Sequence, residues 1–262
     1  MKLSKDLEVL PGSPNTLVYQ GRVVVDLGGK NASLNLEAEV QLATHGHMDH
    51  IAGLLRESKV RYLPREDMWA LSLLGRRVMT YGFSSKDSPL FTYDLLKEEI
   101  SLSGDPEVEI VKLPGHTPGH SGYIVGNVLY AGDAFFGNRV LEGFVFPFYA
   151  DFWTAVESMQ KIKEIAKGLD NVVIAHGPVY EKKKMMEILE YNLNYADKLV
   201  SWVREAIRDG ATAEEVVVKI MEKTVKDIKP TNVILNSITA KSILSQVAKE
   251  VTVEDKGVVY RS

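Results

Sequence analysis

The spacing of apolar residues divides the chain into a first part rich in short strands and a second part rich in helices. In the first part, runs of Val, Leu and Ile alternate with Gly and Pro turns, and helical spacing is confined to 49–58 and 151–167. Two strands joined by a tight turn at Gly21 are predicted within 17–27. Further strands are predicted at 37–43, 60–63, 107–113, 123–125, 128–131 and 172–175. Strands that alternate with helices predict an α/β fold rather than an all-β barrel.

The second part has mainly helical periodicity. Its apolar positions predict three helices and a final hairpin, at 185–208, 212–226, 231–249 and 251–260. Thr212 and Glu215 have the spacing of a capping box, which predicts the start of the second of these helices. We therefore predict two units, a domain over 1–180 and a mainly helical extension over 181–262.

Composition excludes several classes of chemistry. The 262 residues include no Cys, so disulfides, cysteine-held zinc, iron–sulfur clusters and cysteine nucleophiles are excluded, and any metal must be bound by His and carboxylates. The net charge of -4 gives no general attraction to a phosphate backbone, so we do not expect nucleic acid as a partner. The N-terminus does not resemble a signal peptide, and no run of about 18 apolar residues is found. We therefore expect a cytoplasmic protein that does not enter a membrane.

Four metal-capable side chains lie within six positions, in the pattern His45-x-His47-x-Asp49-His50. Side chains two apart on an extended segment point the same way, so His45 and His47 can bind one cation. The following turn lets Asp49 and His50 reach a second position nearby. The alternative is a set of surface or helix-capping polar residues, and these groups would then be costly to satisfy without a cation.

The other metal-capable residues follow predicted strands. His116 and His120 lie in a turn that contains Gly and Pro, Asp133 follows one short apolar strand, and His176 follows another. Polar groups at strand ends along one edge of a sheet predict a functional site on a rigid platform. Imidazole and carboxylate ligands of this kind suit zinc, iron or manganese.

These motifs resemble, in their order along the chain, the metallo-β-lactamase superfamily of metallohydrolases. The matching strings are Val25-Asp26-Leu27-Gly28, His45-x-His47-x-Asp49-His50, Gly115-His116-Thr117-Pro118-Gly119-His120, Gly132-Asp133 and Ala175-His176-Gly177. The resemblance covers about 10–180. It implies an α/β fold of the αββα four-layer type, in which two sheets pack face to face between outer helices and the metals lie at one edge. The extension bears a weaker resemblance to a winged-helix-like module and to the helical tail of glyoxalase II.

The resemblance also implies a role for each of these residues. The ligands of two divalent ions would be His45, His47 and His116 for the first ion, Asp49, His50 and His176 for the second, and Asp133 for both. Zinc is the first expectation, with iron or manganese as alternatives. Asp26 would orient a ligand histidine or a nearby loop, or else is a turn residue at a strand end. His120 is expected to hold its turn by hydrogen bonds rather than to bind metal.

Two metal ions at one edge imply hydrolysis by a hydroxide that the ions share. We expect attack on the carbonyl of a thioester, ester or lactone, in a small-molecule substrate with an acyl or aromatic group. Asp133 would bridge the ions, and Asp49 would accept a proton from the attacking water. One alternative is a persulfide dioxygenase with a single iron on His45, His116 and Asp133. The other is a ribonuclease, which only the winged-helix-like tail supports.

Two variable stretches are expected beside the metals. One is an aromatic segment that follows Asp133, with side chains at Phe135, Phe136, Phe144, Phe146, Phe148, Tyr149, Phe152 and Trp153. It predicts either an apolar wall for the substrate, or a core cluster or a subunit contact in a homodimer, and the tandem Phe135-Phe136 favours an exposed role. The other stretch is 65–94, where Arg76 and Arg77 either bind a substrate anion or are solvated.

Overall fold

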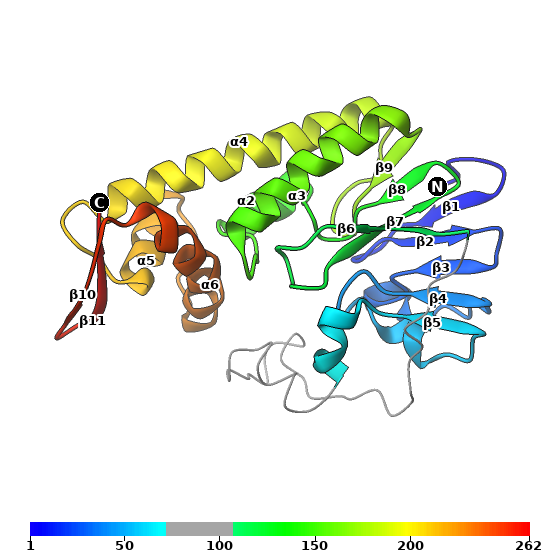
Figure 1. The fold of residues 1–262 in the computed structure, drawn as a ribbon, viewed down its shortest axis with the longest axis horizontal. Coiled ribbons are helices and arrows are strands. Elements are labelled where there is room, and N and C mark those ends of the chain that lie inside the picture. The colour runs from blue at the N-terminus through cyan, green and yellow to red at the C-terminus, as the bar shows by residue number, and fades with distance from the viewer. Residues whose placement is uncertain (72–106) are drawn as a thin grey trace.

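The computed structural model describes residues 1–71 and 107–262, and two mixed sheets lie toward one end of this part of the chain (Figure 1). The first sheet has the strand order β1-β2-β3-β4-β5, with the bounds Leu7–Leu10, Thr16–Tyr19, Val23–Val25, Val40–Leu42 and Val60–Tyr62. The second has the order β6-β7-β8-β9, with the bounds Glu109–Lys112, Ser121–Val125, Val128–Tyr130 and Asn171–Val173. The predicted turn between β2 and β3 contains Gly21 at a φ of 65°, which glycine adopts without strain.

The two sheets pack face to face. Side chains of β3 alternate between faces, so Val23 and Val25 enter one buried cluster together with Tyr123, Val125 and Val173 of the second sheet. Each such side chain contributes about 1.5–3 kcal/mol when it leaves water. The cluster between the sheets is therefore the core that fixes the strand ends on which the candidate site stands.

Helices cover the outer faces of both sheets. On the second sheet, α3 (Phe152–Ile165) and α4 (Lys182–Ala206) bury Met159, Ile162 and Leu189 against Leu129 and Ile174. Among the described residues, the first sheet is covered by three 3-10 helices, η1 (Gly29–Ser33), η2 (Ala52–Leu55) and η3 (Arg65–Leu71). The predicted αββα layering is confirmed.

The predicted helix over 49–58 is shorter than its periodicity indicates, since only η2 forms there. The backbone N–H of Gly53 donates to the carbonyl of Leu27 at 2.8 Å, outside the segment. That N–H is therefore not available for the bond that an α-helix would need.

The extension folds as its periodicity predicts. It contains α5 (Ala213–Lys223), α6 (Pro230–Val247) and a hairpin of β10 (Glu250–Glu254) and β11 (Gly257–Arg261), and α4 leads from the sandwich to these elements (Figure 1). The capping box is present, because Thr212 accepts from the N–H of Glu215 at 3.1 Å and the carboxylate of Glu215 accepts from the N–H of Thr212 at 2.8 Å. None of the helices in the two described ranges combines the length and apolarity that a bilayer span requires.

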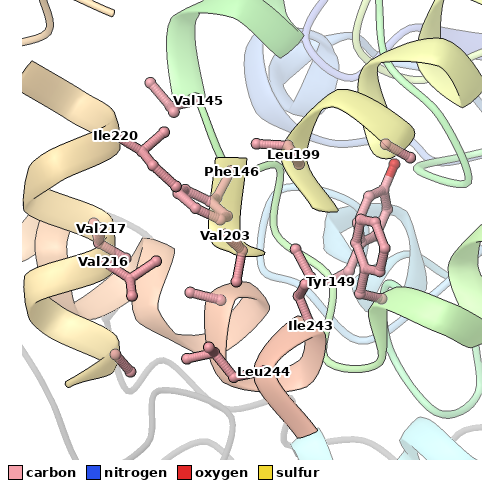
Figure 2. Close-up of a cluster of buried hydrophobic side chains, with 14 of the residues drawn as sticks. Val145, Phe146, Tyr149, Leu199, Val203, Val216, Val217, Ile220, Ile243 and Leu244 are labelled. Carbon is pink, nitrogen blue, oxygen red and sulfur yellow. The ribbon is translucent and has the colours of Figure 1, made fainter. Parts of the chain in front are cut away.

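A second large apolar cluster joins the extension to the aromatic segment (Figure 2). Phe146 and Tyr149 pack with Leu199 and Val203 of α4 and with Ile243 of α6. The same segment contains α2 (Asn138–Phe144), which the sequence did not predict. The division into domains at position 180 stays a prediction, and residues on both sides of it share this core.

Candidate metal centre

The seven candidate ligands meet at one edge of the sandwich. His45, His47, Asp49 and His50 follow β4, and the remaining three each follow a strand of the second sheet, His116 after β6, Asp133 after β8 and His176 after β9. β6 and β8 both run antiparallel to β7, and β9 runs parallel to β8, so these three strands end at the same edge. The fold therefore brings together residues that lie up to 131 positions apart in the sequence, as from His45 to His176.

Three imidazole nitrogens converge at the first position. Nε2 of His45 lies 2.8 Å from Nδ1 of His47, and Nε2 of His116 lies 3.0 Å from the same atom. The carbonyl of Phe148 accepts a hydrogen bond from Nδ1 of His116 at 2.7 Å, so Nε2 of the neutral ring carries a lone pair. Nδ1 of His45 lies 3.0 Å from the hydroxyl of Thr44.

The second position is formed by Asp49, His50 and His176. Nε2 of His50 lies 3.3 Å from Nε2 of His176, and Oδ2 of Asp49 lies 3.6 Å and 3.4 Å from these two atoms. Nδ1 of His50 lies 2.7 Å from Oδ2 of the buried Asp26, and Nδ1 of His176 lies 2.7 Å from the hydroxyl of Ser13. Asp26 thus holds His50, a candidate ligand, in place.

Asp133 lies between the two positions. Its Oδ2 is 3.3 Å from Nε2 of His116, 3.7 Å from Nε2 of His50 and 3.5 Å from Nε2 of His176. Its Oδ1 is buried and has no hydrogen-bond partner among the described residues. A buried carboxylate oxygen without a partner is costly, so this atom calls for a cation or a proton donor.

The proton positions fit a metal at the first position. The hydroxyl of Thr44 donates to Oδ2 of Asp26 at 2.8 Å, so it accepts from Nδ1 of His45, which leaves Nε2 of His45 with a lone pair. Nε2 of His116 has a lone pair as well. Nδ1 of His47 faces both of these nitrogens and carries at most one proton, so it cannot give each lone pair a full hydrogen bond. Burial, with the neighbouring histidines, lowers the pKa of His45 and His116 well below their ordinary values, so the rings stay neutral.

The charge of the second position also fits a cation. Burial alone would lower the pKa of His50, but the carboxylates of Asp26, Asp49 and Asp133 raise it to about 10. Three carboxylates around one buried imidazole form a strongly negative site. The donor set, imidazole nitrogens and carboxylate oxygens, is the one that zinc, iron and manganese accept.

His120 is placed as a structural residue. Its Nδ1 donates to the carbonyl of Leu113 at 2.9 Å, and its Nε2 accepts from the N–H of Asp133 at 2.9 Å. Burial lowers the pKa of His120 to about 4, which keeps the ring neutral, as both bonds require. Because both ring nitrogens are used, His120 fastens the turn to the Asp133 loop and does not face a metal.

Asp67 is a further residue of the site, and sequence reasoning missed it. Its buried carboxylate accepts from the N–H of Gly46 at 2.9 Å, the hydroxyl of Thr117 at 2.7 Å and the N–H of Gly119 at 2.7 Å. It therefore ties the loop of His45 and His47 to the loop of His116. A Cβ on Gly119 would lie 2.6 Å from Oδ1 of Asp67, so the close approach requires glycine. Nothing in the sequence distinguishes Asp67 from the exposed Glu66 beside it.

The aromatic segment serves more than one purpose. The exposed role that the sequence favoured for Phe135 and Phe136 is wrong, since both side chains are buried, Phe135 in the core under α3 and Phe136 in the cluster that joins this segment to the extension. The chain turns between them, so the rings enter different cores. Phe144 is 45% exposed, and the ring of Phe148 lies 5.4 Å from that of His47. The buried ring of Phe136 borders the site as well, 5.9 Å from the ring of His116 and 6.4 Å from that of His176.

A cavity of about 730 Å³ opens beside the candidate ligands. One wall is formed by α2 and the aromatic segment, with Arg139, Phe144 and Phe148. The opposite wall comes from the extension, with Met221 of α5 and Lys226 of the following loop. The predicted second wall at Arg76 and Arg77 lies outside the described residues.

Solved structures share the fold. A metallo-beta-lactamase family protein of Thermus thermophilus superposes with a TM-score of 0.69 at 14% identity, with all of both chains covered. A beta-lactamase domain protein of Burkholderia ambifaria gives a TM-score of 0.65 at 17% identity, covering all of this chain and 94% of that one. These similarities concern the fold alone.

Curated relatives carry an enzyme name. A hydroxyacylglutathione hydrolase of Shewanella baltica is 29% identical over 146 residues, which are 52% of this chain and 50% of the relative. The hydroxyacylglutathione hydrolase GloC of Haemophilus influenzae is 29% identical over 171 residues, covering 59% of this chain and 79% of the relative. For the Shewanella enzyme and several others, the chain thus spans about half the length of the relative.

A family model places these similarities in one group. Residues 42–177 match the model of the metallo-beta-lactamase superfamily, and they contain all seven candidate ligands. Since this match covers more than half of the 262 residues, the chain belongs to the metallo-beta-lactamase superfamily.

Proposed function

We propose that this protein is a metal-dependent hydrolase that binds two divalent ions, with zinc as the first expectation, and acts on the carbonyl of a thioester, ester or lactone. One observation carries the proposal: six metal-capable side chains meet in two groups beside Asp133, and five of these seven residues line a largely apolar cavity. The hydroxyacylglutathione hydrolases similar to this chain are named for the cleavage of an acyl group, which supports an acyl substrate.

The two groups of ligands give each side chain a defined task. When bound, the two ions would supply Lewis acidity at the carbonyl oxygen and would activate a water. Asp133 would hold the two positions together, because its Oδ2 lies within 3.7 Å of Nε2 of His50, His116 and His176. Asp49 borders the cavity, where it can take up the proton that the water releases. The presence of a second complete group favours this reaction over the single-iron persulfide dioxygenase, which needs only His45, His116 and Asp133.

The walls of the cavity indicate the chemistry of the substrate. Phe144, Phe148 and Met221 offer apolar surface for an acyl chain. Arg139 and Lys226 line the same cavity, and neither side chain has a charged partner among the described residues. Asp227 beside them is paired with Lys229 at 2.9 Å. We therefore propose a substrate that combines an apolar acyl group with an anionic group.

The proposal is tested on metal-free protein reconstituted with zinc, iron or manganese. The substrates are an acyl thioester, a lactone, a β-lactam, a phosphodiester and glutathione persulfide. We expect zinc-dependent cleavage of the thioester or the lactone, lost with a chelator and restored by zinc. Iron-dependent formation of sulfite from the persulfide would establish the dioxygenase instead. Turnover of the phosphodiester alone would establish the nuclease.

A further inference from the structure

Three polar side chains of α6 bind the backbone of the aromatic segment at regular intervals. Asn236, Thr239 and Ser242 accept hydrogen bonds from the N–H groups of Phe146, Tyr149 and Phe152, each at 2.9 Å. Both sets of residues are spaced by three, so α6 and the segment run in register over two helical turns. Asn236 and Thr239 are buried, and these bonds therefore form away from competing water.

Thr239 holds the segment on both sides of Phe148. Its Oγ1 accepts from the N–H of Tyr149 at 2.9 Å and donates to the carbonyl of Pro147 at 2.8 Å. Phe148 therefore lies between two backbone groups that a single hydroxyl fixes. The position and direction of the Phe148 carbonyl follow from this arrangement.

The carbonyl of Phe148 is the group that orients His116. It accepts from Nδ1 of His116 at 2.7 Å, which turns Nε2 toward Nδ1 of His47 at 3.0 Å. The backbone of the segment is also bonded to that of the His116 turn, from the N–H of Asp151 to the carbonyl of Gly115 at 2.9 Å. A chain of direct contacts thus leads from Thr239 through Phe148 to His116.

The segment needs such support because its backbone is strained. Val145 has a φ of 68°, a conformation that a β-branched residue rarely adopts. The hydroxyl of Tyr195 on α4 donates to the carbonyl of Val145 at 2.8 Å, and the side chains of Val145 and Phe146 are buried against the extension (Figure 2). Without these contacts the strained conformation would relax.

We propose that Thr239 is a positioning residue for the candidate metal ligand His116, so that the C-terminal extension is a working part of the metal centre. Thr239 touches neither metal position. It acts by fixing the peptide that keeps Nδ1 of His116 protonated and Nε2 free. The inference rests on the role of His116 proposed above, and it extends that role to a helix more than 100 residues away in the sequence.

The test compares three variants of the full chain in their zinc affinity and in their unfolding without metal. Thr239→Val removes the hydroxyl and keeps the shape, whereas Thr239→Ser keeps the hydroxyl. Ser242→Ala is the matched control, because it removes the same kind of bond from the same helix but releases Phe152 instead of the groups beside Phe148. Zinc affinity is measured by competition with a chromophoric chelator, which requires no turnover.

We expect Thr239→Val to lower the affinity for one of the two zinc ions by about tenfold or more. Thr239→Ser should have affinities close to those of the wild type. Ser242→Ala should leave both affinities within about twofold, even if it lowers the unfolding midpoint. If Thr239→Val and Ser242→Ala lose zinc affinity equally, or if Thr239→Val loses none, the inference is wrong and Thr239 only stabilises the packing of α6. A wild type that binds neither zinc, iron nor manganese would instead contradict the proposed function.

A measurement on the wild type covers the case in which Thr239→Val does not fold. In metal-free protein labelled with ¹⁵N-histidine, we expect His116 to carry its proton on Nδ1 and that proton to exchange slowly with water. A proton on Nε2, or rapid exchange at Nδ1, would overturn the inference.

Discussion

The two candidate metal positions have similar ligands but different support. His45 and His116 at the first position are almost fully buried, and distant parts of the chain hold their loops. At the second position the side chains of Asp49 and His176 are 27% and 14% exposed, and the support comes from the N-terminal part of the chain, through Asp26 and Ser13. The first position thus depends on Asp67 and on the aromatic segment, and Asp26 reaches it indirectly through Thr44. The second position depends on Asp26 directly, through His50.

This difference predicts which substitutions affect which ion. Changes at Asp67 or Thr239 should act on the first position, because these residues fix the loops of His45, His47 and His116. Changes at Asp26 should act on the second position through His50. Asp133 is in contact with residues of both groups, so its loss should affect both ions.

The largest effect is expected for Asp133→Asn. An amide brings no negative charge to the ions, so both positions should lose zinc, and kcat/KM should fall by about 10³-fold or more, which corresponds to about 4 kcal/mol. Burial raises the pKa of Asp133, so a neutral side chain should not destabilise the metal-free protein. Zinc content by mass spectrometry, activity and thermal unfolding check the three statements. Asp151→Asn, at an exposed helix cap, is the control. Retention of two zinc ions would contradict the bridging role.

Asp26→Asn should separate the two positions. Oδ2 of Asp26 accepts from both Thr44 and His50, and an NH2 group there would face Nδ1–H of His50. His50 would then move its proton to Nε2, which cannot bind metal in that state. We expect the second zinc to bind about 10- to 100-fold more weakly. Binding of the first zinc should be weakened less, because Asp26 reaches His45 indirectly, through the hydroxyl of Thr44. Calorimetric titration of metal-free protein measures both. A loss confined to the first zinc would reverse our assignment.

Asp67→Asn should act on stability and on the first position. The amide can accept only through its one oxygen, so at least one of the donors from Gly46, Thr117 and Gly119 loses its partner. We expect a loss of about 1–3 kcal/mol in the free energy of unfolding of the metal-free protein. The affinity for the first zinc should fall more than the affinity for the second. Glu66→Gln, an exposed neighbour, is the control for denaturant unfolding and zinc affinity. Equal stability of Asp67→Asn and Glu66→Gln would contradict the role of Asp67.

The smallest effect is expected for Arg139→Gln and Lys226→Gln, which should leave both zinc ions in place. Each charge lies on the rim of the cavity, where an ion pair contributes about 0.2–1 kcal/mol. KM for a thioester with a carboxylate should rise by about two- to fivefold per substitution, without a change in kcat. The matched neutral thioester should be unaffected. An equal change for both substrates would show that the anionic group does not contact these residues.

Much of the candidate site could be predicted because its ligands follow strands. His45, His47, Asp133 and His176 stand directly after short apolar runs, and the direction of those strands brings their ends to one edge. The helices of the extension were also predictable, since α5 begins at a capping box formed by Thr212 and Glu215. Local patterns of this kind depend on residues close in the sequence.

The missed features depend on residues that are far apart. The local sequence around Asp67 indicates no special role. Its role follows from three hydrogen-bond donors that two remote loops bring to its carboxylate in the folded protein. Thr239 is an ordinary polar residue within a helix, and its importance comes from the peptide on the other side of Phe148. Phe135 and Phe136 looked like an exposed pair because adjacent residues of an extended segment point in opposite directions. In the structure each ring is buried in a separate apolar cluster, so neither needs to be exposed.

The central claim is that the seven side chains bind two ions, and anomalous diffraction at the zinc edge tests it most directly. Crystals of zinc-loaded protein should show two peaks, one in contact with His45, His47 and His116 and the other with Asp49, His50 and His176. Asp133 should be in contact with both. A single peak, or none among these side chains in protein that has been given excess zinc, would contradict the account.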